Sequence, residues 1–504
     1  MAKDAEPHPL ENFSSLDTSG FYRDRKNILF VTSEFADLVK AGGLGDVSAH
    51  LPRALRARHD VRVLIPGYSQ AMASDHQVRM VGKVASRGAL PACRLGMMEL
   101  DDGMPVYVLI CPELYERDGF PYGDRCGADW PDNFLRFALL GYVACEIAGG
   151  RASLDWSVDL VHANDWPAGL APAYMHWRQV KVPTVFTVHN LQYQGAFPDI
   201  GPQDLGLRAD RDLDAIRIDG AISYLKAALV HAQHITTVSK AYAQEITGQK
   251  LGCGLHQLLR KKAAQQALTG IVNGISDSWQ PHTDPHLLPF PAEWETSGKD
   301  VHARYLEDRF KLQKGSGPIF SIVSRLVHQK GIDLSIAITD ALVANGGRLV
   351  VIGRGEPALE SALQALQVRH PGKVGVMIGF NETDGRRIFA GSDFLLMPSR
   401  FEPCGLSQLY AQRLGCLPIA HRTGGLIDTI EDGVNGFLFN SFSVADYAAA
   451  IQRAMTVYAA RDQLRTMRYM AMASPKYWNS SVSPYYEIYS RLINGDARPQ
   501  VIAG

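Results

Sequence analysis

The sequence contains little cysteine, and its cysteines are not arranged for cross-linking or for binding a metal. Only seven of the 504 residues are cysteines, and no two of them stand at a C-x-x-C spacing. Neither a disulfide framework nor a zinc site is therefore expected, and a reducing compartment such as the cytoplasm fits best. No other constellation of metal ligands stands out, and no cofactor is expected.

Long apolar runs and an excess of one charge are also missing. No apolar stretch approaches the roughly 18 residues needed to span a bilayer. Lysine and arginine number 51 against 52 acidic residues, which gives a formal net charge of -1. Neither a membrane nor a nucleic acid is therefore expected as the main partner. Residues 1–25 lack the apolar core of a secretory signal and are predicted to form a mobile extension.

What the chain does have is length and a repeated alternation of short apolar runs with helix-like stretches. A chain of 504 residues is too long for one hydrophobic core, so two or more domains are expected. The alternation is typical of parallel sheets covered on both faces. It predicts an α/β fold with two doubly wound, Rossmann-like domains facing a deep cleft. The predicted strands are 28–32, 61–65, 106–110, 159–162, 184–188 and 235–238, then 319–323, 349–352, 374–378 and 394–397.

The break between the domains is predicted near residues 268–280, before a stretch that contains several prolines. The first domain would then span 26–270 and the second 271–476. Residues 477–504 are predicted to return to the first domain as a helix. Ligands of doubly wound domains lie at the carboxyl ends of the strands, so polar residues there are the candidates for function.

A glycine-rich stretch from Lys40 to Val47 follows the first predicted strand and precedes a helix-like run. Glycines such as Gly42 and Gly43 let the backbone approach a ligand closely, and a helix N-terminus offers free N–H groups to a phosphate. The stretch has neither the Gly-Lys-Ser/Thr of a Walker loop nor the full G-x-G-x-x-G spacing. By itself it predicts either a phosphate-binding loop, with Lys40 adding a charge, or an ordinary tight turn.

Polar residues end two further strands of the first domain. His162 to Trp166 close one strand, and His189 with Asn190 closes the next. Because the carboxyl ends of parallel strands meet at one edge of a sheet, these side chains are predicted to converge there. A histidine or an aspartate at that edge can bind sugar hydroxyls, and Trp166 can support a sugar face. The plainer alternative is that Asp165 caps a helix and that the histidines satisfy hydrogen bonds in the core.

The second domain carries charged residues at the corresponding positions. Arg325 and Lys330 follow its first strand and suit a diphosphate, whose charge they would neutralise as it leaves. A solvated surface pair is the alternative. Glu402 follows the strand that ends at Met397. It would bind sugar hydroxyls or stabilise a positively charged anomeric centre, unless it caps a helix.

Two glycine turns accompany these charges. Gly405 and the pair Thr423-Gly424 precede predicted helix starts, where backbone N–H groups can bind a phosphate. Plain turns are the alternative. Cys404 has no histidine partner within its motif and is predicted to be a small buried thiol, not a nucleophile.

Together these motifs resemble the bacterial glycogen synthase and plant starch synthase family, glycosyltransferases of the GT-B fold. Each match is modest alone, but they occur in order and are highly specific as a set. The matching segments are Lys40–Val47, Pro121-Tyr122, Asp132-Asn133, Leu135–Phe137, His162–Trp166, Thr187–Leu191, Thr237–Ser239, Asn273–Ile275, Ser324–Gly331, Ser399–Leu406 and Arg422–Leu426.

The resemblance implies a role for each matched position. The first domain would be the acceptor side, where Tyr122 and Asp165 line the glucan site, and the second would bind the nucleotide sugar. The residues implied in catalysis are His189 at the reacting sugar, Arg325 and Lys330 at the diphosphate, and Glu402 at the transferred glucose. The residues implied in donor binding are Lys40, Gly42, Gly43, Asn273, Phe380 beside the base, Cys404, Gly405, Leu406, Thr423 and Gly424.

The chain departs from the family pattern at four places. Tyr410 stands where retaining GT-B enzymes often have a second glutamate, so only Glu402 can carry that role. Ser276 replaces the usual aspartate after Asn-Gly-Ile, and Phe380 replaces a frequent tyrosine. Lys476-Tyr477-Trp478 stands where the family tends to have Phe-Ser-Trp.

The resemblance implies transfer of glucose from ADP-glucose to the non-reducing 4-hydroxyl of an α-1,4-glucan such as glycogen, with retention at the anomeric carbon. Two alternatives stay open. One is a related GT-B transferase that uses UDP-glucose or a small acceptor, and the other is a catalytically silent glucan-binding protein. A pyridoxal-phosphate-dependent glucan phosphorylase is disfavoured, because no segment for the cofactor lysine is recognisable.

Overall fold

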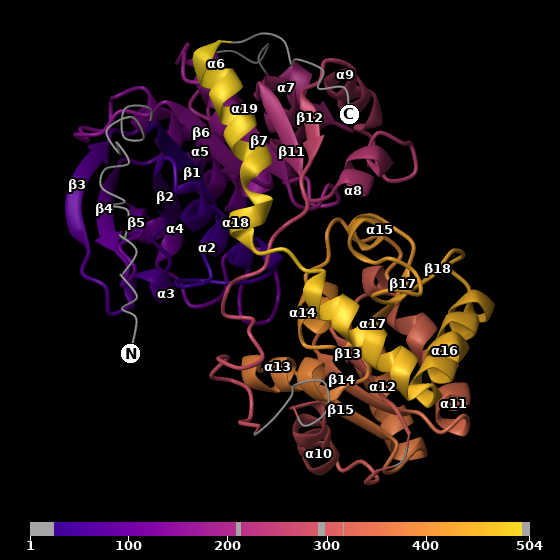
Figure 1. The fold of residues 1–504 in the computed structure, drawn as a ribbon. Coiled ribbons are helices and arrows are strands. Elements are labelled where there is room, and N and C mark those ends of the chain that lie inside the picture. Colours follow the sequence, from indigo (N-terminus) through magenta and orange to yellow (C-terminus); the bar gives the residue numbers. More distant parts are fainter. Residues whose placement is uncertain (1–24, 208–212, 291–297, 316, 496–504) are drawn as a thin grey trace, which may run out of the picture.

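Two α/β domains joined by two neighbouring segments of chain make up the molecule (Figure 1). The computed structural model describes residues 25–207, 213–290, 298–315 and 317–495. All but the last residue of the predicted extension 1–25 lies outside the described residues. So does the end of the predicted segment 477–504.

The first domain is built on a nine-stranded sheet in the order β12-β11-β7-β6-β1-β2-β5-β4-β3. Neighbours from β12 to β5 run parallel, whereas β4 pairs antiparallel with both β5 and β3. Strands β6 and β7 are buried along their whole length, as expected of parallel strands covered on both faces. The bounds are β1 (Asn27–Val31), β2 (Asp60–Pro66), β3 (Arg79–Val84), β4 (Cys93–Glu99), β5 (Pro105–Ile110), β6 (Leu160–Asn164), β7 (Thr184–Val188), β11 (His234–Thr237) and β12 (Leu268–Gly270).

Helices cover both faces of this sheet, and a small sheet in the order β8-β10-β9 lies beside it. Helix α5 is buried along most of its length because it packs closely on α6. At their contact, a Cβ on Gly141 would lie 2.9 Å from the backbone nitrogen of Ala171. The remaining bounds are α2 (Gly43–Leu55), α3 (Ser69–Met72), α4 (Pro112–Tyr115), α5 (Asn133–Ala148), η1 (Trp166–Ala168), α6 (Leu170–Trp177), β8 (Ala196–Phe197), η3 (Asp214–Ile216), β9 (Arg217–Ile218), β10 (Ala221–Ser223), α7 (Tyr224–His231), α8 (Lys240–Glu245) and α9 (His256–Ala264).

The second domain has a parallel six-stranded sheet in the order β15-β14-β13-β16-β17-β18, with one apolar cluster on each face. Its strands are β13 (Ile319–Val323), β14 (Arg348–Gly353), β15 (Val374–Ile378), β16 (Phe394–Met397), β17 (Leu417–His421) and β18 (Phe437–Phe439). Its helices are α10 (Lys299–Arg309), η5 (His328–Lys330), α11 (Ile332–Ala344), α12 (Pro357–Arg369), α13 (Glu382–Gly391), α14 (Ser407–Arg413), α15 (Gly425–Thr429), α16 (Val444–Ala459) and α17 (Arg461–Ala473).

The two connections between the domains run side by side. The backbone N–H of Ile275 donates to the carbonyl of Lys476 at 2.9 Å. The chain then forms α18 (Trp478–Ser481) and α19 (Ser483–Asn494), and α19 lies on the first domain (Figure 1). Tyr489 of α19 is fully buried in the core of the first domain, 2.6 Å from His162.

The structure confirms the predicted α/β class, and each of the ten predicted strands is present. The expectation of purely parallel sheets is wrong at one edge of the first sheet, where β3 and β4 form an antiparallel pair with Gly82 and Gly96 inside the strands. A glycine weakens the strand pattern in a sequence. At Gly82 a Cβ would lie 2.3 Å from the carbonyl oxygen of Ala152, so close approach of another backbone explains the residue.

Candidate functional site

The predicted motifs of the two domains meet across the interface between them. A Cβ on Gly43, at the start of α2, would lie 3.5 Å from Cδ1 of Leu406 in the second domain. Arg325, after β13, donates to the hydroxyl of Tyr193 in the first domain at 3.1 Å. The loops at the carboxyl ends of the two sheets therefore face each other in contact.

The two histidines of the first domain have different surroundings. His162 lies within β6 and is fully buried, and its ring nitrogens contact the hydroxyls of Tyr489 and Thr187 at 2.6 and 2.7 Å. The plainer interpretation of His162, a satisfied core histidine, is therefore correct. His189 follows β7, with Nε2 at 3.1 Å from Oδ1 of Asn164. Burial lowers the pKa of His189 to about 3, so its imidazole is neutral near pH 7.

Asp165 is held in a strained conformation at the end of β6. Its φ of 55° lies in the left-handed region, which is uncommon for a residue with a side chain and which clusters at functional sites. Burial raises the pKa of its carboxyl group to about 7, although the backbone N–H groups of His189 and Trp166 oppose that rise. Its Oδ1 is buried and accepts no hydrogen bond from the described residues. The side chain does not cap η1, so the capping interpretation is wrong.

The glycine-rich loop is organised by a carboxylate that the sequence analysis missed. Glu34 is 3% exposed, and its Oε2 accepts the backbone N–H groups of Ala41 and Gly42, both at 2.8 Å. Its Oε1 accepts the hydroxyl of Tyr122 at 2.6 Å. In this structure the N–H of Gly42 is therefore engaged within the protein. Glu34 lies close after the end of β1, so the rule that drew attention to His189 also applied to it.

Lys40 forms an ion pair with Asp46, 2.7 Å away, within the same loop. Its side chain is 43% exposed, so a ligand in the cleft can reach the ammonium group. Across the interface, burial of Glu382 at the start of α13 opposes ionisation, but the hydrogen bond from Arg386 lowers the pKa of Glu382, with a smaller contribution from Lys40. The loop thus presents one accessible cation to the second domain.

The second domain contributes a partly buried ion pair. Nζ of Lys330 lies 2.6 Å from Oε2 of Glu402, which also accepts the hydroxyl of Ser399 at 3.0 Å. Glu402 is 5% exposed and does not cap a helix. The structure therefore brings two of the predicted catalytic residues together, with Arg325 five residues from Lys330 along the same loop.

The residues predicted to lie around the donor differ in burial and in contacts. Asn273 is 4% exposed, and its buried Oδ1 accepts no hydrogen bond from the described residues. The thiol of Cys404 contacts the backbone of Asn273, and burial raises the pKa of that thiol to about 12. A thiol that stays protonated is a poor nucleophile. Gly405, with a φ of 72°, turns the chain into α14. Phe380, after β15, is 68% exposed and so offers a free aromatic face.

Thr423 and Gly424, predicted to contact the donor, form hydrogen bonds with the first domain in this structure. Oε1 of Glu245 accepts the backbone N–H of Gly424 at 2.9 Å and the hydroxyl of Thr423 at 3.2 Å. Glu245 ends α8 and was not identified from the sequence. No pattern within its own segment marks it, because its partners lie about 180 residues further along the chain.

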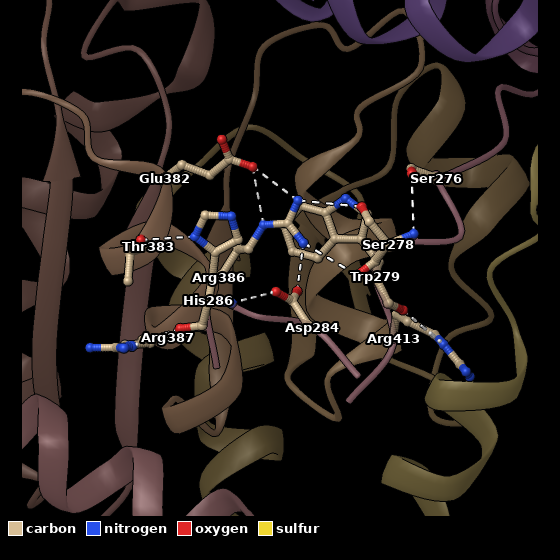
Figure 2. Close-up of polar contacts among 10 residues, drawn as sticks. All are labelled: Ser276, Ser278, Trp279, Asp284, His286, Glu382, Thr383, Arg386, Arg387 and Arg413. Carbon is tan, nitrogen blue, oxygen red and sulfur yellow. Dashed lines mark hydrogen bonds and ion pairs between the residues drawn. The ribbon is translucent and has the colours of Figure 1, made fainter. Parts of the chain in front are cut away.

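Two of the positions that depart from the family pattern, Tyr410 and Ser276, lie beside Trp279 and the polar network around it. The ring of Tyr410 stacks on Trp279 with centroids 3.9 Å apart, and the guanidinium of Arg386 covers the other side of Trp279 at 4.1 Å. Figure 2 shows Arg386 between Asp284 and Glu382, with Ser276 at the edge of the same network. Tyr410 therefore acts in packing, and the network anchors the segment after Asn273 to α13.

The described residues were also searched for a metal site, a membrane-spanning helix and disulfides. Among the described residues, no group of three His, Cys, Asp or Glu side chains is arranged to hold a metal ion. Within the same residues, no helix has both the length and the apolar character to cross a membrane. All seven cysteines are free thiols.

Two family models match the chain, one in each domain. The model described as "Starch synthase catalytic domain" matches residues 27–261. The model described as "Glycosyl transferases group 1" matches residues 305–469. The first match includes every strand of the nine-stranded sheet except β12, and the second includes the whole six-stranded sheet.

Curated relatives are similar along nearly the whole chain. A glycogen synthase of Pseudomonas aeruginosa is 55% identical over 477 residues, which cover 94% of this chain and 93% of the relative. A glycogen synthase of Pseudomonas fluorescens is 54% identical over 473 residues, which cover 93% of this chain and 97% of the relative.

Solved structures share the arrangement of the two domains. The catalytic domain of starch synthase IV from Arabidopsis thaliana, bound to ADP and acarbose, superposes with a TM-score of 0.81 at 27% identity, covering 93% of this chain and 100% of that one. A sucrose-phosphate synthase from Thermosynechococcus elongatus superposes with a TM-score of 0.59 at 17% identity, covering 94% and 100%. The second likeness shows the fold alone.

Proposed function

Because this chain belongs to the glycogen synthase family and is a hexosyltransferase with the GT-B fold, we propose that it transfers glucose from ADP-glucose to the non-reducing end of an α-1,4-glucan. The configuration at the anomeric carbon would be retained. The observation that carries this proposal is the ion pair of the partly buried Lys330 with the buried Glu402, which lies opposite a wall that carries a neutral His189.

The charged side chains of the second domain would hold the donor. Arg325 and Lys330 would bind the diphosphate, and Lys40 would approach it from the first domain. Glu402, fixed by Lys330 and Ser399, would lie beside the transferred glucose, where its charge stabilises a positively charged anomeric centre. The free acceptor Oδ1 of Asn273 suits a donor-sugar hydroxyl, and Phe380 suits the base.

The first domain would bind the acceptor and the reacting sugar. Tyr122 and Asp165 would line the glucan site, and the free acceptor Oδ1 of Asp165 suits a glucan hydroxyl. A neutral imidazole at His189 can donate a hydrogen bond to a sugar hydroxyl without adding a charge. The leaving diphosphate would take the proton of the incoming 4-hydroxyl on the same face of the ring, which gives retention.

We also propose the domain boundaries 26–270 and 271–476, with the chain from 477 onward returning to the first domain so that the cleft can close and exclude water. The packing of Tyr489 in the first core supports the return. The cytoplasm is the proposed location, and the seven free thiols support a reducing compartment.

The test is incorporation of labelled glucose into glycogen by the purified protein, with ADP-glucose and UDP-glucose compared at equal concentration. We expect incorporation from ADP-glucose, at a rate well above that from UDP-glucose, and new linkages in the α configuration by proton NMR. A preference for UDP-glucose would replace the donor in this proposal. Incorporation from neither donor, in a folded protein, would favour a silent glucan-binding protein.

A further inference from the structure

Helix α8 of the first domain and α15 of the second exchange carboxylate contacts across the interface, and the two helices lie next to each other in Figure 1. Glu245, at the end of α8, accepts the N–H of Gly424 just before α15. Asp428, within α15, accepts the N–H of Ala241 near the start of α8 at 2.9 Å. Each helix therefore satisfies backbone donors near the start of the other with a carboxylate. We call these four residues the α8–α15 clasp.

The clasp is connected directly to the proposed catalytic carboxylate. The backbone N–H of Gly425 donates to the carbonyl of Glu402 at 2.9 Å. Gly424 has a φ of 46°, and a Cβ there would lie 2.0 Å from the same carbonyl oxygen. The backbones of Gly424 and Glu402 thus touch, and only glycine allows that approach. A shift of Gly424 would be transmitted to Glu402.

A further contact reaches the same loop from the start of α8. The hydroxyl of Ser239 donates to the carbonyl of Pro403 at 2.5 Å and accepts the N–H of Tyr242. Pro403 follows Glu402 directly. The first domain therefore holds the loop of Glu402 from two sides, through Ser239 and through Glu245.

We propose that Glu245 is a positioning residue for glucose transfer. It fixes the angle between the two domains, so that Glu402 lies opposite the side of the cleft that carries His189. This inference rests on the function proposed above. Glu245 is not among the residues proposed to contact the nucleotide sugar or the glucan. It acts through Gly424 and Gly425 on Glu402, and loss of its contact would leave donor binding to the second domain largely intact while misaligning the two walls. Misplacement by about 1 Å in an active site can cost roughly 100-fold in rate.

The clasp also contains a feature that allows it to open. Oε2 of Glu245 is buried and accepts no hydrogen bond from the described residues. An unpaired buried carboxylate oxygen is unfavourable, and exposure to water when the domains separate would remove that cost. The contact is therefore selective for one domain angle without locking the cleft shut.

The test measures kcat and KM for ADP-glucose in Glu245→Ala, Thr423→Val and Asp428→Ala, with glycogen as acceptor. We expect Glu245→Ala to lower kcat by roughly 10- to 100-fold and to change KM by less than about threefold. Thr423→Val and Asp428→Ala should lower kcat less, since each removes one contact. Glu245→Gln keeps the accepting oxygen and should restore most of the turnover.

The matched controls are carboxylates that accept a backbone N–H within one domain. Asp432→Ala removes such a contact to Leu438 in the second domain, and Asp204→Ala removes one to Gly201 in the first. Both should stay within about twofold of the wild-type kcat. If Glu245→Ala does not fold, Thr423→Val tests the contact of Glu245 from the second domain, and Asp428→Ala tests the reciprocal contact of the clasp.

Small-angle scattering with ADP bound gives a readout that does not need turnover. We expect a larger radius of gyration for Glu245→Ala than for the wild type, and no change for Asp204→Ala. A wild-type kcat in Glu245→Ala, a change in KM alone, or an unchanged radius would overturn the inference. A wild-type protein without transferase activity would instead contradict the proposed function, while the scattering comparison would still test the clasp.

Discussion

The two walls of the cleft use opposite chemistry. On the first domain, burial keeps His189 neutral, with a pKa of about 3, and raises the pKa of Asp165 to about 7. On the second domain the candidates are charged, and Lys330 is paired with Glu402 at 2.6 Å. The first wall therefore suits hydrogen bonds to sugar hydroxyls, and the second suits a diphosphate and a developing positive charge.

The two walls also differ in how their polar groups affect the stability of the fold. On the second wall Lys330 and Glu402 compensate each other, so removal of Lys330 leaves the buried carboxylate of Glu402 without its partner. The polar groups of the first wall include a strained, unpaired aspartate, which costs stability in the absence of ligand. Variants on each wall test this contrast between neutral hydrogen-bonding groups and paired charges, and they are given in order of decreasing expected effect.

Lys330→Ala should have the largest effect. We expect kcat to fall by roughly two orders of magnitude or more, because the leaving diphosphate loses a cation and Glu402 loses its partner. Circular dichroism should show an intact fold. Arg369→Ala, which removes an exposed ion pair with Asp340 in the same domain, is the control and should leave kcat unchanged. Near-normal turnover of Lys330→Ala would remove the phosphate-binding role.

His189→Ala should lower kcat by roughly 10- to 100-fold through loss of a hydrogen bond to the reacting sugar. Because the folded pKa of His189 is about 3, its neutral form persists as pH falls through 6.5, and the rate should show no inflection there from this residue. His176→Ala, an exposed position in the same domain, is the control. A wild-type inflection near pH 6.5 that disappears in His189→Ala would show a charged imidazole and contradict the neutral wall.

Lys40→Ala should lower kcat by roughly tenfold and leave the melting temperature within about 2 °C of wild type, since its pair with Asp46 is largely exposed. Differential scanning fluorimetry and initial rates measure the two effects. A variant that unfolds at lower temperature but keeps its turnover would assign the loop to structure instead of donor binding.

Asp165→Asn should have the smallest effect on kcat, and it should increase the free energy of unfolding. A carboxyl group whose folded pKa is raised to about 7 binds more protons in the folded than in the unfolded state, so its contribution favours folding at low pH and is lost as pH rises toward 7. The asparagine variant should therefore gain up to about 4 kcal/mol relative to wild type at pH 8, but little at pH 4. Denaturant unfolding at the two pH values measures this, and equal differences would contradict the raised pKa.

The strands were predictable from the sequence because each is a short β-branched run bounded by turn residues. β7 and β13 match their predicted ranges residue for residue. The antiparallel β3 and β4 escaped prediction because Gly82 and Gly96 interrupt their pattern. The general positions of site residues followed from the rule that polar side chains gather at strand ends.

The partners of those residues were not predictable in the same way. The pairing of Lys330 with Glu402 and the contact of Glu245 with Gly424 join positions 72 and 179 residues apart. No periodicity or spacing encodes such contacts, because they depend on how the two sheets face each other. The strain at Asp165 is likewise set by the turn between β6 and η1, and it cannot be predicted from the residue type.

A crystal structure with ADP and a maltooligosaccharide bound tests the contrast between the walls most directly. We expect the diphosphate within hydrogen-bonding distance of Lys330 and Arg325, and glucan hydroxyls at Asp165 and Tyr122 across the cleft. A diphosphate bound to the first domain away from both cations, or a glucan lodged on the second domain beside Glu402 alone, would contradict it.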